Sequence, residues 1–323
     1  MPPRWSPPRT PDGQPDLQGV WANNTVTPFE RPQELAGKEF LTDDELAVLK
    51  QRAARLFGGA GDFAPGDELF LTLLRNPQEH RSPRPTGDYN QVWLDDGLVF
   101  ENRTSQIVDP PDGQLPPLTP QGRQQQAAAA VSRRLHPADG PEDRVPQERC
   151  ITFGTARVGF LQARNNSYHQ IIQTPGYVVI YSEMIHEARI IPLDGRPHTS
   201  TTIRSWSGDS RGRWDGQTLV IDTTNFSAHP TFLQKPSLPV SGEHVHLTER
   251  LTPVDPDTIR YEATVDDPTT WTKSWTAVTT WKRSSEPMFE YACHEANYAL
   301  VHILRGARAD ENAAAEAAKN DRK

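Results

Sequence analysis

Groups that could transfer protons or bind a polar molecule are concentrated between residues 183 and 222, which contain two histidines, five arginines and two tryptophans. In this segment His186 lies close to two acidic residues, Glu183 and Glu187. A carboxylate beside an imidazole orients the ring and raises its basicity, as in many general acid/base pairs. We therefore expect His186 to act as a general acid or base, with Glu183 or Glu187 as its partner. The same residues also fit a surface hairpin with solvated charges.

Arginine and tryptophan side chains follow in the second half of this segment. If the chain is extended there, Arg204 and Trp206 share one strand face, and so do Arg211 and Arg213. Guanidinium groups beside indoles bind carboxylates, sugars or aromatic rings through paired hydrogen bonds and stacking. A structural network, in which Asp209 pairs with Arg211 or Arg213, fits the spacing equally well. With amide and phenol groups from elsewhere in the chain, the predicted substrate-binding residues are Arg204, Trp206, Asp209, Arg211, Arg213, Trp214, Tyr89, Asn165 and Asn166.

His294 and Glu295 form another candidate group, directly after Cys293 and before a helical pattern. Helix N-termini stabilise anionic groups and ligands. We predict that both residues belong to the catalytic site and that His294 lies close in space to His186. The two cysteines, Cys150 and Cys293, can form one disulfide, which an oxidising compartment favours, or remain two buried thiols.

His244 and His246 are separated by one residue, which places both imidazoles on the same face of a strand. Such a pair, with Glu249 nearby, can chelate Zn²⁺ or Cu²⁺, although similar pairs also occur without a metal. We predict no resident cofactor, and keep a divalent metal at His244 and His246 as the alternative.

Several classes of protein are disfavoured by what the sequence lacks. No Walker loop, GxGxxG after a strand, HExxH or CxxC pattern is present. The net charge of −8 and the pI near 5.7 argue against binding to nucleic acid or to anionic membranes, since both need a basic surface. No apolar run is long enough to span a bilayer, and the N-terminus has no apolar signal core. The expected partner is a small-molecule or carbohydrate substrate, and the oligomeric state stays open.

The second half of the chain has the alternation of apolar and polar residues that is typical of strands. Strands are predicted at residues 158–163, 168–174, 177–184, 188–192, 201–206, 212–214, 217–223, 244–251, 258–265 and 272–281. Consecutive strands without intervening helices form a meander, and a long meander closes to protect its edges. We therefore predict a mainly β protein, in which an antiparallel meander closes into a lipocalin-like barrel or a sandwich with a few peripheral helices. Trp271, Trp275 and Trp281 share one strand face, which packs in the core or lines a ligand cavity.

The first half mixes strands and helices. Gly19-Val20-Trp21 resembles the first strand of lipocalin-like barrels, with Trp21 as a core plug. Further strands are predicted at residues 87–93 and 99–108. A capping box from Thr42 to Glu45 predicts a helix that ends at Gly58, and Thr119-Pro120 predicts a second helix.

The chain is expected to form one main domain. Residues 1–18 are rich in proline and should wrap around the domain or fray. Residues 19–308 then form a single β-rich domain, or two coupled half-barrels with a boundary near residue 150. A short helix is predicted at residues 297–305, and the charged tail 309–323 should fray.

Five blocks of the sequence resemble a large family of uncharacterised secreted bacterial proteins. These blocks are PDLQGVW, EMIHEARIIPLDGRPH, GDSRGRWDGQTLVIDTTNF, RYEATVDDP and EYACHEANY. The resemblance extends from about residue 14 to residue 306. It implies an exported protein, periplasmic or extracellular, whose signal peptide has been removed, and it implies no particular reaction.

Three functional hypotheses follow. The first is a secreted, cofactor-independent acid/base enzyme, a lyase, hydrolase or hydratase, that acts on a polar or aromatic small molecule or a carbohydrate. In this hypothesis His186 and His294 exchange protons, and Arg204, Arg211 and Arg213 stabilise negative charge. The second is a lipocalin-like periplasmic protein that binds a ligand inside the barrel. The third is a metalloprotein with histidine ligands.

Overall fold

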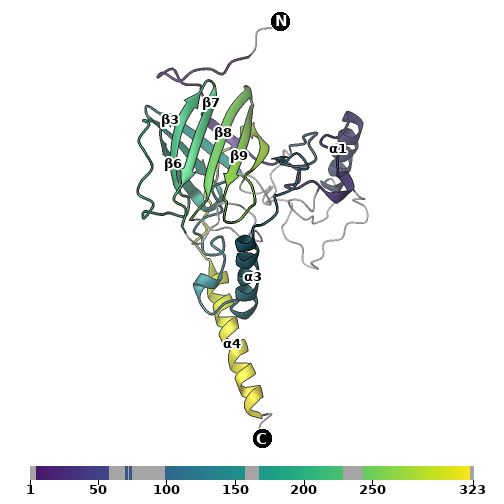
Figure 1. Cartoon of the computed structure of the whole chain (residues 1–323), viewed down its shortest axis with the longest axis vertical. Helices are drawn as coiled ribbons and strands as arrows, with labels where there is room; N and C mark the ends of the chain where they lie inside the picture. Colours follow the sequence, from purple (N-terminus) through teal and green to yellow (C-terminus); the bar gives the residue numbers. More distant parts are fainter. Residues whose placement is uncertain are drawn as a thin grey trace.

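The computed structural model describes residues 5–57, 70–71, 73–74, 99–156, 167–227 and 243–320, and it is dominated by one antiparallel sheet (Figure 1). The strands are β1 (Gly19–Ala22), β2 (Ile107–Asp109), β3 (Tyr168–Thr174), β4 (Tyr177–Ser182), β5 (Glu187–Pro192), β6 (Asp209–Asp215), β7 (Thr218–Thr224), β8 (His246–Asp255), β9 (Thr258–Asp266) and β10 (Trp275–Arg283). The sheet curls into a nearly closed barrel. The predicted mainly β barrel with a few helices is therefore confirmed.

The strands follow the order β5-β4-β3-β1-β10-β9-β8-β7-β6, with β2 added beside β10. The two edge strands, β5 and β6, lie next to each other and form the seam of the barrel. Side chains connect them there, because Arg189 on β5 donates to the hydroxyl of Ser210 on β6 at 3.2 Å. Near the same place Ile191 and Leu193 lie directly over the backbone of Gly212.

Most of the predicted strands are present, with ends shifted by a few residues. Two predictions are wrong. Residues 201–206 form a loop that has only an isolated bridge at Ser205, because none of its side chains is buried on either face. In the range 99–108 only the end belongs to a strand, because the backbone amides of Thr104 and Gln106 donate to carbonyls of the irregular segment 24–39. The strands predicted at 87–93 and 158–163 lie outside the described residues.

Large aromatic side chains fill the barrel. Trp271, Trp275 and Trp281 are 1% exposed or less, and they belong to the main core cluster together with Tyr261. Trp271 and Trp275 pack edge to face, with ring centroids 5.6 Å apart. The shared face predicted for the three tryptophans thus points into the core.

The N-terminal segment, residues 5–18, crosses one end of the barrel, drawn at the top in Figure 1. Gln173 on β3 holds this segment, because its side chain accepts from the amide of Leu17 and donates to the carbonyl of Pro15. Under it, Trp21 is 1% exposed, and the guanidinium of Arg283 stacks 4.3 Å from the Trp21 ring centroid. The predicted wrapping of this segment and the plug role of Trp21 agree with this arrangement.

The described residues include three named helices and three short 3-10 turns outside the barrel. They are α1 (Asp43–Phe57), α3 (Pro120–Leu135), α4 (Tyr298–Asn320), η1 (Gln33–Leu35), η3 (Pro141–Asp143) and η4 (Met184–His186). The capping box of α1 is present, since the Thr42 hydroxyl accepts from the Glu45 amide and the Glu45 carboxylate accepts from the Thr42 amide. The Thr119 side chain likewise caps α3.

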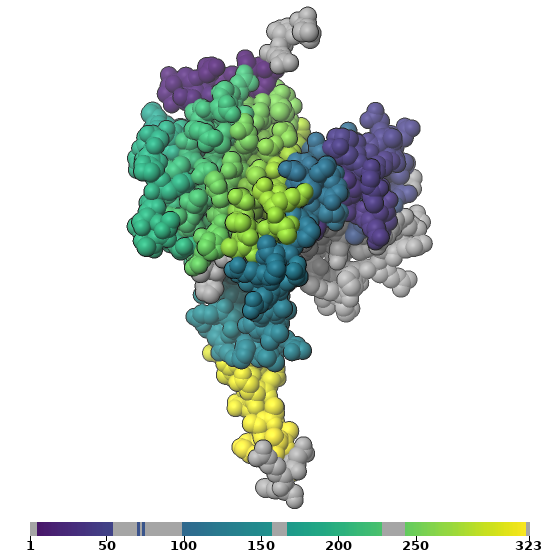
Figure 2. Space-filling model, in the orientation of Figure 1, coloured from purple at the N-terminus to yellow at the C-terminus, as the bar shows by residue number. Residues whose placement is uncertain are grey.

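Helix α4 is longer than the sequence indicated and extends away from the barrel (Figure 2). The predicted end near residue 305 and the predicted frayed tail are wrong. Alanine has the highest helix propensity, and the pairs Arg308–Glu311 and Glu316–Lys319 add support three residues apart. No described helix is both long and apolar enough to cross a membrane.

The close approach of β5 and β6 depends on a missing side chain at Gly212. A Cβ atom there would lie 2.6 Å from Leu193 Cδ2 and 2.9 Å from Ile191 Cγ2. We predict that Gly212→Ala lowers the free energy of unfolding by about 1–3 kcal/mol, because the seam must open to admit the methyl group. Urea unfolding followed by circular dichroism measures this.

Gly306→Ala is the matched control, because a Cβ at this position in α4 meets no atom within 4 Å. This variant should be unchanged or more stable by up to about 1 kcal/mol. Equal stability of Gly212→Ala and wild type would contradict close packing at the seam.

Candidate functional site

The interior of the barrel carries a set of buried polar side chains. Most share the inward face of their strand with core residues two positions away, as alternation along a strand requires. All are less than 9% exposed. They are Ser167, His169, Ser182, Arg189, Ser210, Thr223, Glu249, Tyr261 and Thr279. Small barrels normally fill this space with apolar side chains, so the set forms a candidate site.

An ion pair lies at the centre of this polar interior. Arg189 on β5 donates to both carboxylate oxygens of Glu249 on β8, at 3.0 and 2.5 Å, and their side chains are 3% and 0% exposed. Burial disfavours the charged guanidinium, but the carboxylate of Glu249 more than compensates and raises the pKa of Arg189. The hydroxyl of Tyr261 donates to Glu249 at 2.7 Å, and Ser210 links Arg189 to Thr223.

Aromatic rings continue this network across the barrel. The indole of Trp281 is stacked between His169, with centroids 4.7 Å apart, and Tyr261, with centroids 4.9 Å apart. Nδ1 of His169 lies 3.1 Å from the hydroxyl of Ser182. The interior therefore combines a stack of rings with a neutralised ion pair.

Within the described part of the chain, four donors in this interior have no hydrogen-bond partner: Nε of Arg189, the hydroxyls of Ser167 and Thr279, and the indole N–H of Trp281. An unsatisfied buried polar group costs about 1–3 kcal/mol. Retaining several of them in one interior points to a use beyond stability.

The polar interior reaches the end of the barrel through Glu187, the first residue of β5. Its carboxylate accepts from the hydroxyls of Thr152 and Ser207. The loop that contains Ser207 also accepts, through its backbone, from Thr155. This end lies opposite the end that the N-terminal segment crosses. The β8–β9 turn and the first residue of β1 are both located at the N-terminal segment's end.

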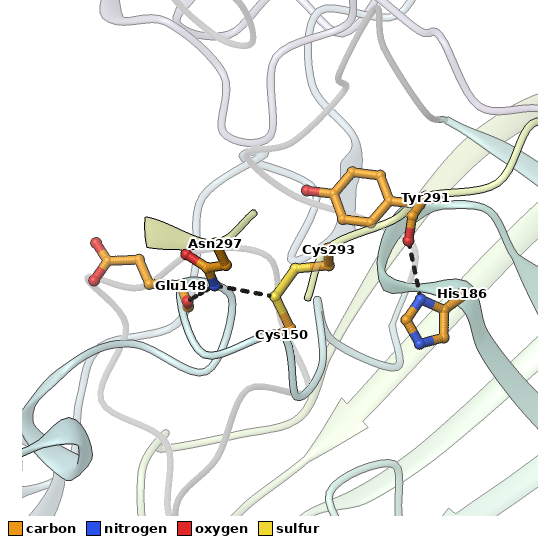
Figure 3. The surroundings of a disulfide bond; sticks show 6 residues. All are labelled: Glu148, Cys150, His186, Tyr291, Cys293 and Asn297. Carbon is orange, nitrogen blue, oxygen red and sulfur yellow. Dashed lines mark hydrogen bonds between the residues drawn. A yellow bond between two sulfur atoms is a disulfide. The ribbon is translucent and has the colours of Figure 1, made fainter. Parts of the chain in front are cut away.

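The predicted meeting of His186 and His294 is confirmed, with ring centroids 6.2 Å apart. A disulfide between Cys150 and Cys293 places His294 there, with Cα atoms 5.7 Å apart (Figure 3). Nδ1 of His186 lies 3.0 Å from the carbonyl of Tyr291, so it carries the proton in this contact (Figure 3). Both imidazoles are exposed.

The two carboxylates predicted beside these histidines have different surroundings. Glu183 is 1% exposed, and its carboxylate accepts from the amide of Phe289 at 3.1 Å. Glu295 is exposed at the surface. His186 and Ile185 have positive φ angles of 42° and 62°, which is an unusual conformation for residues other than glycine and makes the η4 turn a strained one.

The predicted arginine clamp is not assembled around the histidines. Arg204 donates to the carbonyl of Phe226, and Arg211 pairs with Asp209 at 2.7 Å, which is the structural network that the sequence allowed as an alternative. Arg213 is exposed on β6, whereas Trp214 packs against the core and Trp206 is half-buried. Tyr89, Asn165 and Asn166 lie outside the described residues.

A second polar network lies on the outer face of β6, β7 and β8, and the sequence analysis missed it. His198 bridges Asp209 at 2.9 Å and Asp222 at 2.8 Å, while His246 approaches the other oxygen of Asp222 at 2.5 Å. Hydrogen bonding to Asp222 raises the pKa of His246. Burial opposes ionisation of both aspartates, but hydrogen bonds from the imidazoles and other donors keep their pKa values below the usual range.

The metal hypothesis gains no support from the described ranges, which contain no group of three or more His, Cys, Asp or Glu placed to hold an ion. His244 and His246 are exposed, whereas Glu249 points to the inside of the barrel. Glu249, the nearest carboxylate along the strand, is therefore on the opposite face from the two histidines.

The residues of the polar interior were also missed, yet the sequence held a signal. Glu249 lies between Leu247 and Leu251, and Arg189 lies two positions before Ile191, so both charges occupy inward positions of apolar strands. A charged residue at such a position marks a buried polar site or ion pair.

The network on the outer face of β6, β7 and β8 should make the stability of the protein depend on pH. His246 has a raised pKa, so its contribution to stability is complete below the ordinary value of 6.5 and is lost as pH rises through the folded pKa. Asp222 has a lowered pKa, so its contribution is complete above 3.8 and is lost as pH falls through the folded pKa. We predict that Asp222→Asn destabilises most between about pH 4 and 6.5, by roughly 0.5–1 kcal/mol, since solvent screens the partly exposed pair.

Urea unfolding of both proteins from pH 4 to 9 measures the difference. Asp215→Asn is the control, because it breaks an ion pair with Arg250 that contains no histidine, and its effect should not change between pH 5 and 8. The same effect of Asp222→Asn at pH 5 and pH 9 would contradict the coupling to His246.

Comparison with known proteins gives no further evidence on the function of this site. No family model matches the chain, and no curated protein matches it. The resemblance to secreted bacterial proteins therefore stays a prediction, and the functional argument rests on the site.

Proposed function

We propose that the protein is a barrel-type binding protein that holds a small, neutral aromatic molecule in its polar interior. The observation that carries this proposal is the group of four unpartnered donors in the same interior as the stack of Trp281 with His169 and Tyr261. A ligand with carbonyl or ether oxygens would satisfy these donors, and its ring would extend the stack.

The charge of the interior decides between neutral and ionic ligands. Arg189 and Glu249 neutralise each other through two hydrogen bonds, so no net charge remains at the centre to attract an ion. Glu187 adds a carboxylate at the end of the barrel, which disfavours an anion. An anionic ligand would therefore lose hydration without gaining a counter-ion.

The disulfide supports an oxidising location. Disulfides persist mainly outside the cytosol, and this one joins residues 143 positions apart. Together with the resemblance to secreted bacterial proteins, it supports a periplasmic or extracellular binding protein.

The binding proposal is tested with 4-hydroxyacetophenone, which has an aromatic ring and a carbonyl acceptor, against 4-ethylphenol, which lacks the carbonyl. We expect saturable quenching of tryptophan emission by the first compound and binding about five- to tenfold weaker by the second, as the loss of one hydrogen bond implies. Thr279→Val should weaken binding of 4-hydroxyacetophenone by a similar factor while raising the stability of the unliganded protein, because it removes an unsatisfied hydroxyl.

Thr264→Val is the matched control, since Thr264 bonds Thr276 on the outer face of the same strands. It should leave binding unchanged. Absence of saturable binding at 10 mM, or equal affinity of Thr279→Val and wild type, would rule out this role of the interior.

A second proposal is acid/base catalysis at His186 and His294, carried by the 6.2 Å between their rings. The contact with the Tyr291 carbonyl holds the proton of His186 on Nδ1, which leaves Nε2 able to accept a proton when the ring is neutral. The disulfide keeps the second imidazole in place. The chemistry would be that of a lyase, hydrolase or hydratase on a polar substrate.

For this second proposal, hydrolysis of 4-nitrophenyl acetate above the buffer rate is the assay. His186→Ala and His294→Ala should each reduce the excess rate at least about 100-fold, as loss of general acid/base catalysis does, with melting temperatures within a few degrees of wild type. His302→Ala, in exposed helix α4, is the control with an expected full rate. Full activity in both test variants excludes the mechanism.

A further inference from the structure

A hollow of about 330 Å³ lies at the end of the barrel opposite Glu187, beneath the N-terminal segment. Its walls come from three parts of the chain: the N-terminal segment, the turn between β8 and β9, and the ends of β1 and β10. The lining residues used below are Trp5, Asp16, Trp21, Asp255, Asp257 and Arg283.

The floor of the hollow is preorganised around Arg283. Its guanidinium covers the face of Trp21, and it donates to the carbonyls of Gln18 at 3.0 Å and Pro256 at 3.0 Å. Gly19 makes this approach possible, because a Cβ there would lie 2.4 Å from the guanidinium. The guanidinium of Arg283 is therefore already bonded within the wall of the hollow, and it is poorly placed to neutralise a bound anion.

Carboxylates outnumber cations in the lining. Asp16, Asp255 and Asp257 face a single arginine, which gives the hollow a net charge of −2 (three carboxylates and one guanidinium). One oxygen of Asp16 accepts from the Gln18 amide, and one oxygen of Asp255 accepts from the Asp257 amide. These backbone contacts fix both carboxylates and leave their second oxygens available to a ligand.

Aromatic and proline surfaces complete the hollow. Trp5 is 37% exposed and lines it from the N-terminal segment, and Pro8, Pro253 and Pro256 add rigid apolar walls. A cation beside an indole and between carboxylates gains from the ring quadrupole and from charge-assisted hydrogen bonds. The volume accommodates a side-chain-sized group.

We propose that this hollow is a binding site for an organic cation, a guanidinium or ammonium group on a short alkyl chain. The cationic head would lie beside Trp5 and bond Asp16 and Asp255, and the alkyl chain would pack on the prolines. This site is separate from the polar interior, because Leu17 and Trp21, both 1% exposed, close the barrel between them.

Butylguanidinium and butylurea form a matched pair of probes, since they have similar shape and differ in charge. In ¹H–¹⁵N spectra of the full chain, butylguanidinium should shift the Trp5 indole cross-peak saturably, and butylurea at the same concentration should not. The double variant Asp16→Asn with Asp255→Asn should weaken butylguanidinium binding about tenfold, and 0.5 M NaCl should weaken it also.

Asp12→Asn is the control, because Asp12 lies on the same N-terminal segment, outside the hollow, and accepts from the Thr10 hydroxyl. It should bind butylguanidinium as wild type does, and Trp5→Phe serves to assign the cross-peak. No shift of the Trp5 signal by 10 mM butylguanidinium overturns the proposal. So does an equal shift by butylurea, or unchanged affinity in the double variant.

Discussion

The ion pair between Arg189 and Glu249 is the interaction on which the barrel depends. Arg189 projects from one edge strand, β5, and its partners Ser210 and Glu249 belong to β6 and β8, on the other side of the seam. The edges of the sheet are therefore held by a charged side chain rather than by a backbone ladder. Removing one partner leaves an uncompensated buried charge, which costs about 3–5 kcal/mol.

Such an ion pair is an expensive way to close a barrel. Apolar side chains of similar volume often give equal or greater stability, so a buried pair is weak evidence for stability alone. The unpartnered donors at Thr279 and Trp281 add a further cost without any structural return. Polar interiors of this kind are more common where a protein binds or transforms a molecule, which is why we place the candidate function inside the barrel.

Much of the fold follows from alternation along the chain. The predicted bounds of β3 agree with the structure, and a period of two places the tryptophans at 271, 275 and 281 on one face. The β-branched residues in 201–206 favour a strand, but no side chain of this segment is buried, so it forms a loop. The alanines after residue 309 are strong helix formers and extend helix α4 to Asn320.

The site was harder to predict than the fold, for a topological reason. The predicted proximity of His186 and His294 agrees with the structure, in which the disulfide between Cys150 and Cys293 helps to place His294. Arg189 and Glu249 are 60 positions apart, and nothing local relates them; only the strand order, which brings β5 next to β6, makes them neighbours. By contrast, Arg204 donates to the carbonyl of Phe226, and Arg211 donates to Asp209 on its own strand.

The polar interior and the hollow beneath the N-terminal segment offer different groups, and the core keeps them apart. Unpartnered donors lie in the interior, while carboxylates line the hollow. Trp21 lies between these regions, with Arg283 on one side of its ring and the core cluster around it. Because this residue is buried and its indole N–H is bonded to the Leu17 carbonyl at 2.9 Å, it works as a fixed partition. The neutral aromatic molecule proposed for the interior and the organic cation proposed for the hollow would then bind in separate regions, with no polar path between them.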